Sequence, residues 1–151
     1  MLDDTDRRIL RQLQADPTLS GAELAERAGI NAATCWRRLE RLRERGVLRG
    51  SRAVIDWRAL GYTVEVSLRV TLDKTVPRAF EDLADAARQI PEVLEIQTFL
   101  GQVDVRLGLI ARDLVHYQQL YRERILTLPH IADLEALMHV ARIKTDETVP
   151  L

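Results

Sequence analysis

The sequence of 151 residues contains a single cysteine and no long apolar run. One cysteine excludes a disulfide framework within the chain. That residue, Cys35, falls on the packed face of a predicted helix, which is typical of a small buried hydrophobe; a redox-sensitive thiol is the alternative. No stretch is apolar enough to span a bilayer, and no signal-peptide pattern precedes the first helix. These absences predict a cytoplasmic protein with no membrane partner.

Recognisable catalytic motifs are also missing. The three histidines, His116, His130 and His139, are scattered along the chain. There is no glycine-rich phosphate loop, no set of His, Cys, Asp and Glu with metal-ligand spacing, and no evident pair of nucleophile and base. The sequence therefore predicts a protein that is not an enzyme and holds no cofactor or metal.

Charge is distributed unevenly along the chain. The net charge is −1, but residues 1–60 hold 12 arginines against nine acidic residues, whereas residues 61–151 hold ten basic residues against 14 acidic ones. Such asymmetry predicts a basic part that contacts DNA and an acidic part with another role. The length allows two small domains, each near the lower size limit for a self-sufficient core, so oligomerisation is expected to add stability.

Residues 20–46 have the pattern of two helices joined by a tight turn. Ser20 can cap the first helix, and Glu23 can reach back to the Ser20 amide in a capping box. Gly29 suits a left-handed turn position, Asn31 can cap the second helix, and Gly46 can end it. This is the pattern of a helix-turn-helix.

The second of these helices has an apolar face and an arginine-rich face. Residues 36–52 hold seven arginines against two glutamates, a local net charge of +5. In a helix-turn-helix, base edges are read from the N-terminal part of the recognition helix and phosphates are contacted from its flanks. A surface helix with solvated charges is the alternative, and Trp36 is more typical of a packing residue than of a stacking platform. The predicted base-reading group is Ala33, Thr34, Arg37 and Trp36, with the Asn31 cap affecting the bases preferred. The predicted backbone contacts are Arg38, Arg41, Arg45, Arg49 and Arg52.

The remaining patterns predict an α+β protein whose second domain is ferredoxin-like. A first helix over residues 3–15 completes the three-helix part, an extended wing covers 47–56 and a hinge covers 57–61. Strands are then expected at 62–72, 93–100, 103–111 and 131–143, with helices from 77 and 113 and a tight turn at Gly101-Gln102. The order is βαββαβ. We therefore expect a winged helix-turn-helix domain at 1–50, a wing strand and hinge linker at 51–61, and a ferredoxin-like oligomerisation domain at 62–151. The two helices of that last domain would cover one face of its sheet and leave the other for a second subunit.

Taken together, these features resemble the Lrp/AsnC family of prokaryotic transcription regulators over nearly the full chain. The order and spacing of several short motifs carry the resemblance. They are Leu2-Asp3 with Asp6 and Ile9-Leu10; Glu23-Leu24-Ala25 and Gly29-Ile30; Arg37-Arg38-Leu39, Leu42 and Gly46-Val47-Leu48; Leu60-Gly61; Pro91-Glu92-Val93; Gly101 with Asp104; Leu128-Pro129; and Lys144.

The resemblance implies a regulator of amino-acid metabolism genes that binds double-stranded promoter DNA. It implies dimers formed through the C-terminal domains and further assembly into octamers. It also implies an amino-acid effector bound near the G-x-x-D motif, in which backbone amides hold a carboxylate and Asp104 meets an ammonium group. A plain hairpin turn with a solvated aspartate is the alternative. The implied effector-site residues are Thr98, Leu100, Gly101, Val103, Asp104, Val105 and Glu135.

Two departures from the family pattern make the expected pocket more apolar. Val105 stands where the family usually has an aromatic residue, and Leu134 and Ala136 replace polar threonines around Glu135. Such a pocket is compatible with an aliphatic or aromatic amino acid, with a different metabolite, or with no ligand. Two other functions are alternatives: a ligand-independent architectural regulator, and a metabolite-sensing scaffold whose helix-turn-helix makes protein contacts. Salt dependence separates DNA binding from the scaffold, because phosphate contacts weaken steeply with salt.

Overall fold

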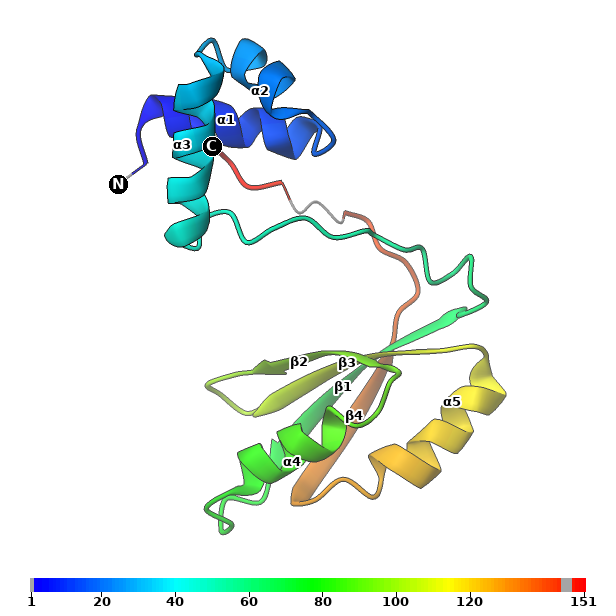
Figure 1. The fold of residues 1–151 in the computed structure, drawn as a ribbon. Helices are drawn as coiled ribbons and strands as arrows, with labels where there is room; N and C mark the ends of the chain where they lie inside the picture. The colour runs from blue at the N-terminus through cyan, green and yellow to red at the C-terminus, as the bar shows by residue number, and fades with distance from the viewer. Residues whose placement is uncertain (1, 145–147) are drawn as a thin grey trace. The chain divides into compact units, whose positions relative to one another are not determined.

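The computed structural model describes residues 2–144 and 148–151, which form two compact units. The helical unit comprises residues 2–54 together with 144 and 148–151, and the sheet unit comprises Ile55–Ile143 (Figure 1). The grouping of 148–151 with the helical unit differs from the expected division, in which the whole of 62–151 formed one domain. The reason is a set of contacts between this segment and the first helix.

The helical unit contains three helices whose ends are set by local capping. They are α1 (Asp4–Ala15), α2 (Gly21–Arg27) and α3 (Ala32–Glu44). Capping boxes begin α1 at Asp3 and α2 at Ser20, and the Asn31 side chain accepts a hydrogen bond from the Thr34 amide at the start of α3. Gly29 and Gly46 both have φ +67°, the left-handed conformation that glycine adopts without strain. The helix-turn-helix pattern predicted for 20–46 is thus formed.

The core of the helical unit is apolar and includes the cysteine. Ile9, Leu24 and Leu42 are almost completely buried, and Cys35 is 1% exposed. Burial raises the pKa of the Cys35 thiol above its ordinary value. The thiol is therefore held in its neutral form, as the packed-face interpretation predicts.

One carboxylate is also buried in this unit, where it joins α1 to α3. Asp6 has no exposed surface, and its two carboxylate oxygens lie 2.9 Å from Arg38 Nη1 and 2.9 Å from Arg41 Nη2. Asp3 adds a second carboxylate 2.6 Å from the same Arg38 nitrogen. Burial alone would raise the pKa of Asp6, but hydrogen bonds from Arg38 and from the Asp3 amide, with the charge of Arg41, bring it below its ordinary value. The cluster thus holds a charge that would be costly to bury without partners.

The linker after α3 does not form the expected wing strand. No residue from 47 to 63 belongs to a β-strand. A lone extended segment has no neighbouring strand to satisfy its backbone groups, so the short apolar run at 53–55 is not enough to make a strand. The hinge expected at 57–61 is present as a series of turns, with the Arg58 guanidinium 4.6 Å from the Trp57 ring centre.

The sheet unit has the predicted βαββαβ order. Its elements are β1 (Val64–Leu72), α4 (Ala79–Ala87), β2 (Val93–Thr98), β3 (Val105–Ala111), α5 (Leu114–Leu120), which continues as one π-helical turn over Tyr121–Ile125, and β4 (Ile131–Met138). The strands lie in the order β2-β3-β1-β4, and every neighbouring pair is antiparallel. The last strand ends at Met138, earlier than the expected residue 143. The β2–β3 connection spans residues 99–104, so it is longer than the expected two-residue turn.

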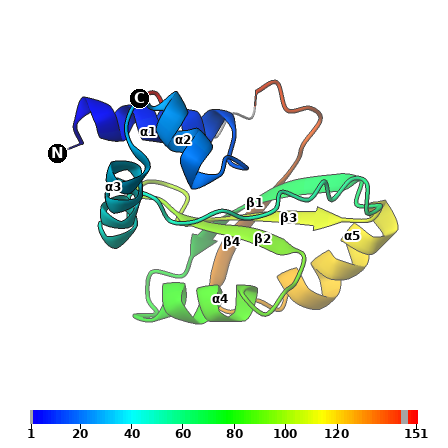
Figure 2. The same ribbon diagram turned by 45° about the horizontal axis from the view of Figure 1, so that its top comes forward.

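The two faces of this sheet differ in chemistry. Helices α4 and α5 lie against one face (Figures 1 and 2), which buries the alternate residues Val66, Leu68 and Val70 of β1. The other face carries ion pairs, with Arg69 Nη1 3.4 Å from Glu135 Oε2 and Arg106 Nη2 2.7 Å from Glu95 Oε2. This second face has no covering element within the sheet unit, as predicted.

Glu65, near the start of β1, binds the chain segment that precedes β1 and the segment that follows β4. Its side chain is only 10% exposed and is paired with Arg142. His139 Nδ1 lies 3.6 Å from one oxygen of Glu65, and Arg58 Nη2 lies 3.8 Å from the other. The turn at 57–61 and the segment that follows β4 are therefore held to the same carboxylate. Among the described residues, none of the helices is both long and apolar enough to cross a membrane.

Replacing Asp6 with asparagine should lower the free energy of unfolding by about 2–3 kcal/mol, because two arginines lose the carboxylate they share while both keep some contact with water. Asp4→Asn is the matched control, since Asp4 is exposed in the same first turn. Urea unfolding measures both variants. Because the pKa of Asp6 is lowered in the folded state, its contribution should be complete at neutral pH and lost as the pH falls below about 4. Equal destabilisation of the two variants would contradict this account.

Candidate DNA-reading surface and ligand pocket

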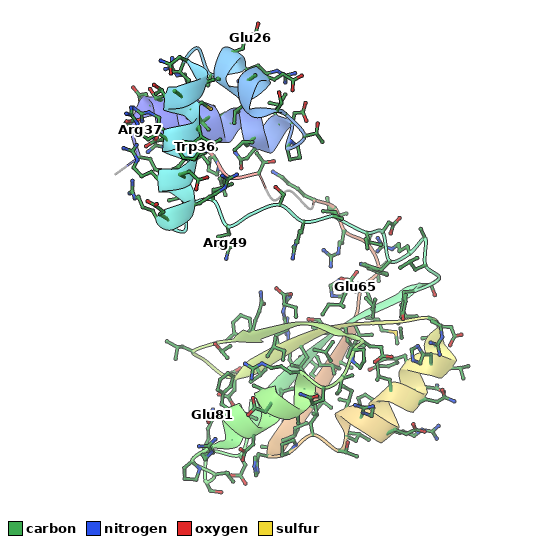
Figure 3. The ribbon with its side chains drawn as sticks, viewed as in Figure 1. Glu26, Trp36, Arg37, Arg49, Glu65 and Glu81 are labelled. Atoms are coloured by element: carbon green, nitrogen blue, oxygen red, sulfur yellow. The ribbon has the colours of Figure 1, made fainter. Side chains whose placement is uncertain are left out.

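Arg37 of α3 and three arginines that follow this helix are exposed and free of partners among the described residues. Among the residues that the structure describes, Arg37, Arg45, Arg49 and Arg52 are exposed and form no ion pair or side-chain hydrogen bond. Arg37 projects from the N-terminal half of α3 (Figure 3). Ala33 is exposed beside it, one turn earlier in the helix. This surface offers unneutralised guanidinium groups, which suit base edges and phosphates.

Two of the predicted phosphate contacts have another role. Arg38 and Arg41 are bound to Asp3 and Asp6, and the Arg38 side chain is only 22% exposed. Their hydrogen bonds to Asp3 and Asp6 direct both guanidinium groups toward α1. The structure therefore assigns these two arginines to holding α1 and α3 together. The sequence did not predict this role, because the helical periodicity of α3 cannot show that the carboxylates of Asp3 and Asp6 lie against that helix.

The start of α3 is arranged by its cap. Asn31 Oδ1 accepts the Thr34 amide hydrogen at 2.8 Å, so the amide side chain is engaged while Asn31 itself stays exposed. Thr34 is half-buried. Trp36 is 66% exposed, so it is not the core packing residue that the sequence suggested. It lies beside a hollow bounded by Leu10, Leu13 and Leu39, among other residues of the helical unit.

In the sheet unit, Asp104 is a structural clamp. One carboxylate oxygen accepts the Leu72 amide hydrogen at 2.8 Å, and the other is paired with Lys74. The hydrogen bond from Lys74, then that from the Leu72 amide, holds the pKa of Asp104 below its ordinary value. The Asp104 side chain is 16% exposed. It is therefore not the solvated turn residue of the simpler interpretation, and its negative charge already has a cationic partner.

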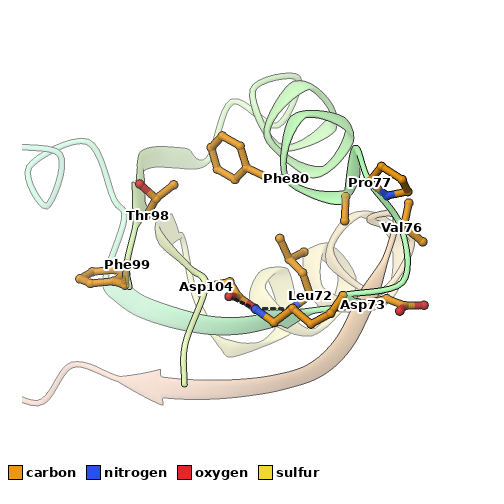
Figure 4. A pocket seen from close by; sticks show the side chains of 10 residues that line it. Leu72, Asp73, Val76, Pro77, Phe80, Thr98, Phe99 and Asp104 are labelled. Carbon is orange, nitrogen blue, oxygen red and sulfur yellow. Dashed lines mark hydrogen bonds and ion pairs between the residues drawn. The ribbon is translucent and has the colours of Figure 1, made fainter. Parts of the chain in front are cut away.

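This ion pair lies at the edge of an open hollow of about 470 Å³ (Figure 4). Thr98 and Phe99 lie on its β2 side, and Phe80 lies on its α4 side. Phe80 and Phe99 are 40% and 47% exposed, an unusual degree for phenylalanine. The volume is within the range of small-molecule pockets, which combine apolar walls with a few polar groups. The remaining lining residues are Leu72, Asp73, Val76, Pro77 and Ala79.

The other expected effector residues are placed apart from this hollow. Leu100, Gly101 and Val103 line a second open hollow of about 510 Å³, which shares Phe99 with the first. Val105 is completely buried between the sheet and the helices, so the prediction that it contacts the ligand is wrong. The error arises because residue 105 begins β3 with its side chain on the helix-covered face. Glu135 lies on the open face of the sheet, paired with Arg69.

Sequence reasoning missed Lys74 and the two phenylalanines. Lys74 follows β1, whereas Asp104 precedes β3, and their proximity depends on the antiparallel pairing of these strands. The spacing of residues along the sequence does not predict which strands pair. Among the described residues, no group of three or more His, Cys, Asp or Glu side chains is placed to hold a metal ion.

Comparisons with known proteins match both units. A winged helix-turn-helix DNA-binding model matches residues 2–49, and the Lrp/AsnC ligand binding domain matches residues 65–149. The leucine-responsive regulatory protein of Escherichia coli (strain K12) is 30% identical over 143 residues, which cover 95% of this chain and 87% of that protein. A transcriptional regulator from Neisseria meningitidis, solved in complex with L-Met, has a TM-score of 0.91 at 28% identity and covers 99% of this chain and 97% of its own. An AsnC family regulator from Agrobacterium tumefaciens has a TM-score of 0.88 at 30% identity, with the same coverage. The chain therefore belongs to the Lrp/AsnC family of DNA-binding transcriptional regulators, with a helix-turn-helix domain followed by a ligand-binding domain.

Proposed function

We propose that this regulator controls genes of amino-acid metabolism in the cytoplasm by binding their promoters in response to an amino acid or related small molecule. The observation that carries the proposal is the Lys74–Asp104 ion pair at the edge of an apolar hollow. These two charges match, in opposite sign, the two charges of an α-amino acid. The L-Met complex of the Neisseria meningitidis regulator supports an amino acid as the class of ligand.

The ion pair is suited to being opened by a ligand. Lys74 is 67% exposed and Asp104 only 16%, so the lysine can leave the pair for solvent while Asp104 keeps its hydrogen bond from the Leu72 amide. An amino acid placed between the two side chains exchanges one ion pair for two, because its carboxylate binds Lys74 and its ammonium group binds Asp104. Its side chain then faces Phe80 and Phe99, which favours an aliphatic or aromatic residue.

On the DNA side, we propose that α3 lies in the major groove. Arg37 reads base edges with Ala33 and Thr34, because these residues occupy the N-terminal half of the recognition helix. Arg45, Arg49 and Arg52 contact phosphates, since they are exposed and unpaired among the described residues. The proposal leaves Arg38 and Arg41 out of this set, because both are paired with Asp3 and Asp6.

Arg37→Ala should weaken specific operator binding by about 1–3 kcal/mol and leave binding to random DNA nearly unchanged, because base contacts carry the sequence preference. Arg45→Ala is the matched comparison. It should weaken binding to both DNAs and reduce the slope of log affinity against log salt by about 1. Fluorescence anisotropy over a salt series measures both effects. Equal losses on operator and random DNA for Arg37→Ala would rule out base reading.

We propose that the regulator forms at least a dimer at micromolar concentration, with octamers as the further assembly. The uncovered sheet face supports this, since a second subunit would cover it. Light scattering should give at least twice the chain mass of 17.2 kDa. Arg69→Glu should lower the average mass, because it sets a like charge beside Glu135 on that face. A wild-type protein of monomeric mass would refute the proposal.

The ligand proposal predicts that a panel of amino acids contains at least one stabilising compound. At about 100 times its dissociation constant, a ligand adds roughly 2.7 kcal/mol and raises the unfolding midpoint by several degrees. Lys74→Met should abolish this shift for the amino acid but not the weaker binding of its decarboxylated amine. Asp104→Asn should affect both, because it removes the partner of the ammonium group. A panel without any stabilising compound would argue against an amino-acid sensor.

A further inference from the structure

Residues 148–151 lie along α1 and are held there by two of its side chains. Gln14 Nε2 donates a hydrogen bond to the Val149 carbonyl at 3.2 Å, and the Val149 amide donates one to Gln14 Oε1 at 2.7 Å. One turn earlier, Arg11 donates from Nε and Nη2 to the Leu151 carbonyl, at 3.0 Å and 2.7 Å. The C-terminal end of the chain is seen beside the helical unit in Figures 1 and 2.

These contacts recognise extended backbone. The Gln14 amide offers a donor and an acceptor to the carbonyl and amide of a single residue, as the facing strand of an antiparallel ladder does. Arg11 lies three residues from Gln14, so both side chains leave the same side of the helix. They bind residues two apart in the segment, which is the repeat of an extended chain. Binding of the segment to α1 therefore depends on an extended backbone conformation at Val149 and Leu151.

A side chain adds selectivity to this backbone hold. Leu151 is partly buried and packs against the apolar core of the helical unit. Val149 is 57% exposed and contributes its backbone only. Main-chain hydrogen bonds with one apolar anchor are the usual way in which proteins bind extended segments.

We propose that this side of α1 is a docking site for an extended segment with an aliphatic anchor, and that its occupant is residues 148–151 of the same chain. We call residues 148–151, docked in this way, the latch. The chain leaves β4, is paired to Glu65 through Arg142, and is bound again at Arg11 and Gln14. The ligand-binding domain is thus joined to the DNA-binding domain by two routes: the linker after α3, and the latch on α1. The proposal is independent of the identity of the effector.

The latch acts on the helix that positions the reading helix. Asp3 and Asp6, near the start of α1, bind Arg38 and Arg41 of α3, whereas Arg11 and Gln14 bind the latch from its last two turns. α1 is therefore bound at one end to α3 and at the other to residues 148–151.

Hydrogen exchange of the Val149 amide in the full chain tests the docking directly. Gln14→Leu removes both bonds to Val149 and should speed exchange of that amide about five- to tenfold, the equivalent of one hydrogen bond. Gln12→Leu is the matched control, because Gln12 lies on the same helix and has no side-chain hydrogen bond among the described residues. Unchanged Val149 exchange in Gln14→Leu, or equal acceleration in both variants, would overturn the proposal.

A chain ending at residue 147 provides a second test, in case Gln14→Leu disturbs α1. It should bind a labelled peptide of residues 144–151 at least about tenfold more tightly than the full chain does, because only the truncated chain has a vacant site. A peptide with Leu151→Asp should bind the truncated chain weakly. Equal peptide binding by the two chains would contradict an occupied docking site.

The remaining question is whether the occupant comes from the same chain. Gln14→Cys with Val149→Cys, treated with a short bis-maleimide, should give a cross-linked product of single-chain mass, since the buried Cys35 does not compete. A product of twice that mass would mean that a second copy supplies the segment, and would overturn the assignment to the same chain.

Discussion

The buried carboxylate of Asp6 is the interaction on which the DNA-binding domain depends. In a domain rich in arginine, one fully buried acid gathers Arg38 and Arg41 and fixes α1 against α3. The cost of burying this charge is offset because each carboxylate oxygen has its own guanidinium partner. The same pairing ties Arg38 and Arg41 to α1, Arg43 is paired with Glu40 on α3 itself, and Arg37 is left exposed without a partner among the described residues. The proposed reading surface therefore consists of the arginines that no carboxylate engages.

Asp104 performs a related function in the ligand-binding domain, but in a different environment. It ties the end of β1 to the start of β3 through the Leu72 amide, and it holds Lys74 at the edge of the hollow. Asp6 is fully buried, whereas the Lys74 partner of Asp104 is mostly exposed. In the proposed ligand site, the ammonium group of an amino acid takes the place of Lys74 beside Asp104. Under that proposal, one carboxylate serves stability and the other serves recognition.

Local patterns predicted much of this architecture. The caps at Ser20 and Asn31, the left-handed glycines and the βαββαβ order all follow from signals within a few residues, because capping and amphipathicity act over short distances. The errors concern partners distant in sequence. The pairing of Arg38 with Asp3 was not predicted, because Asp3 is 35 residues away. Val105 was placed at the ligand site because the side that it faces depends on where β3 begins. Lys74 and the docked segment went unnoticed for the same reason.

The central claim is that Asp6 takes Arg38 and Arg41 away from DNA. The most direct test is the salt dependence of operator binding by Arg41→Ala, with unfolding free energy measured on the same preparation. We expect the free energy of unfolding to fall by about 1–3 kcal/mol, while the slope of log affinity against log salt stays at the wild-type value. A slope reduced by about 1, with unchanged stability, would show that Arg41 neutralises a phosphate and would contradict the account.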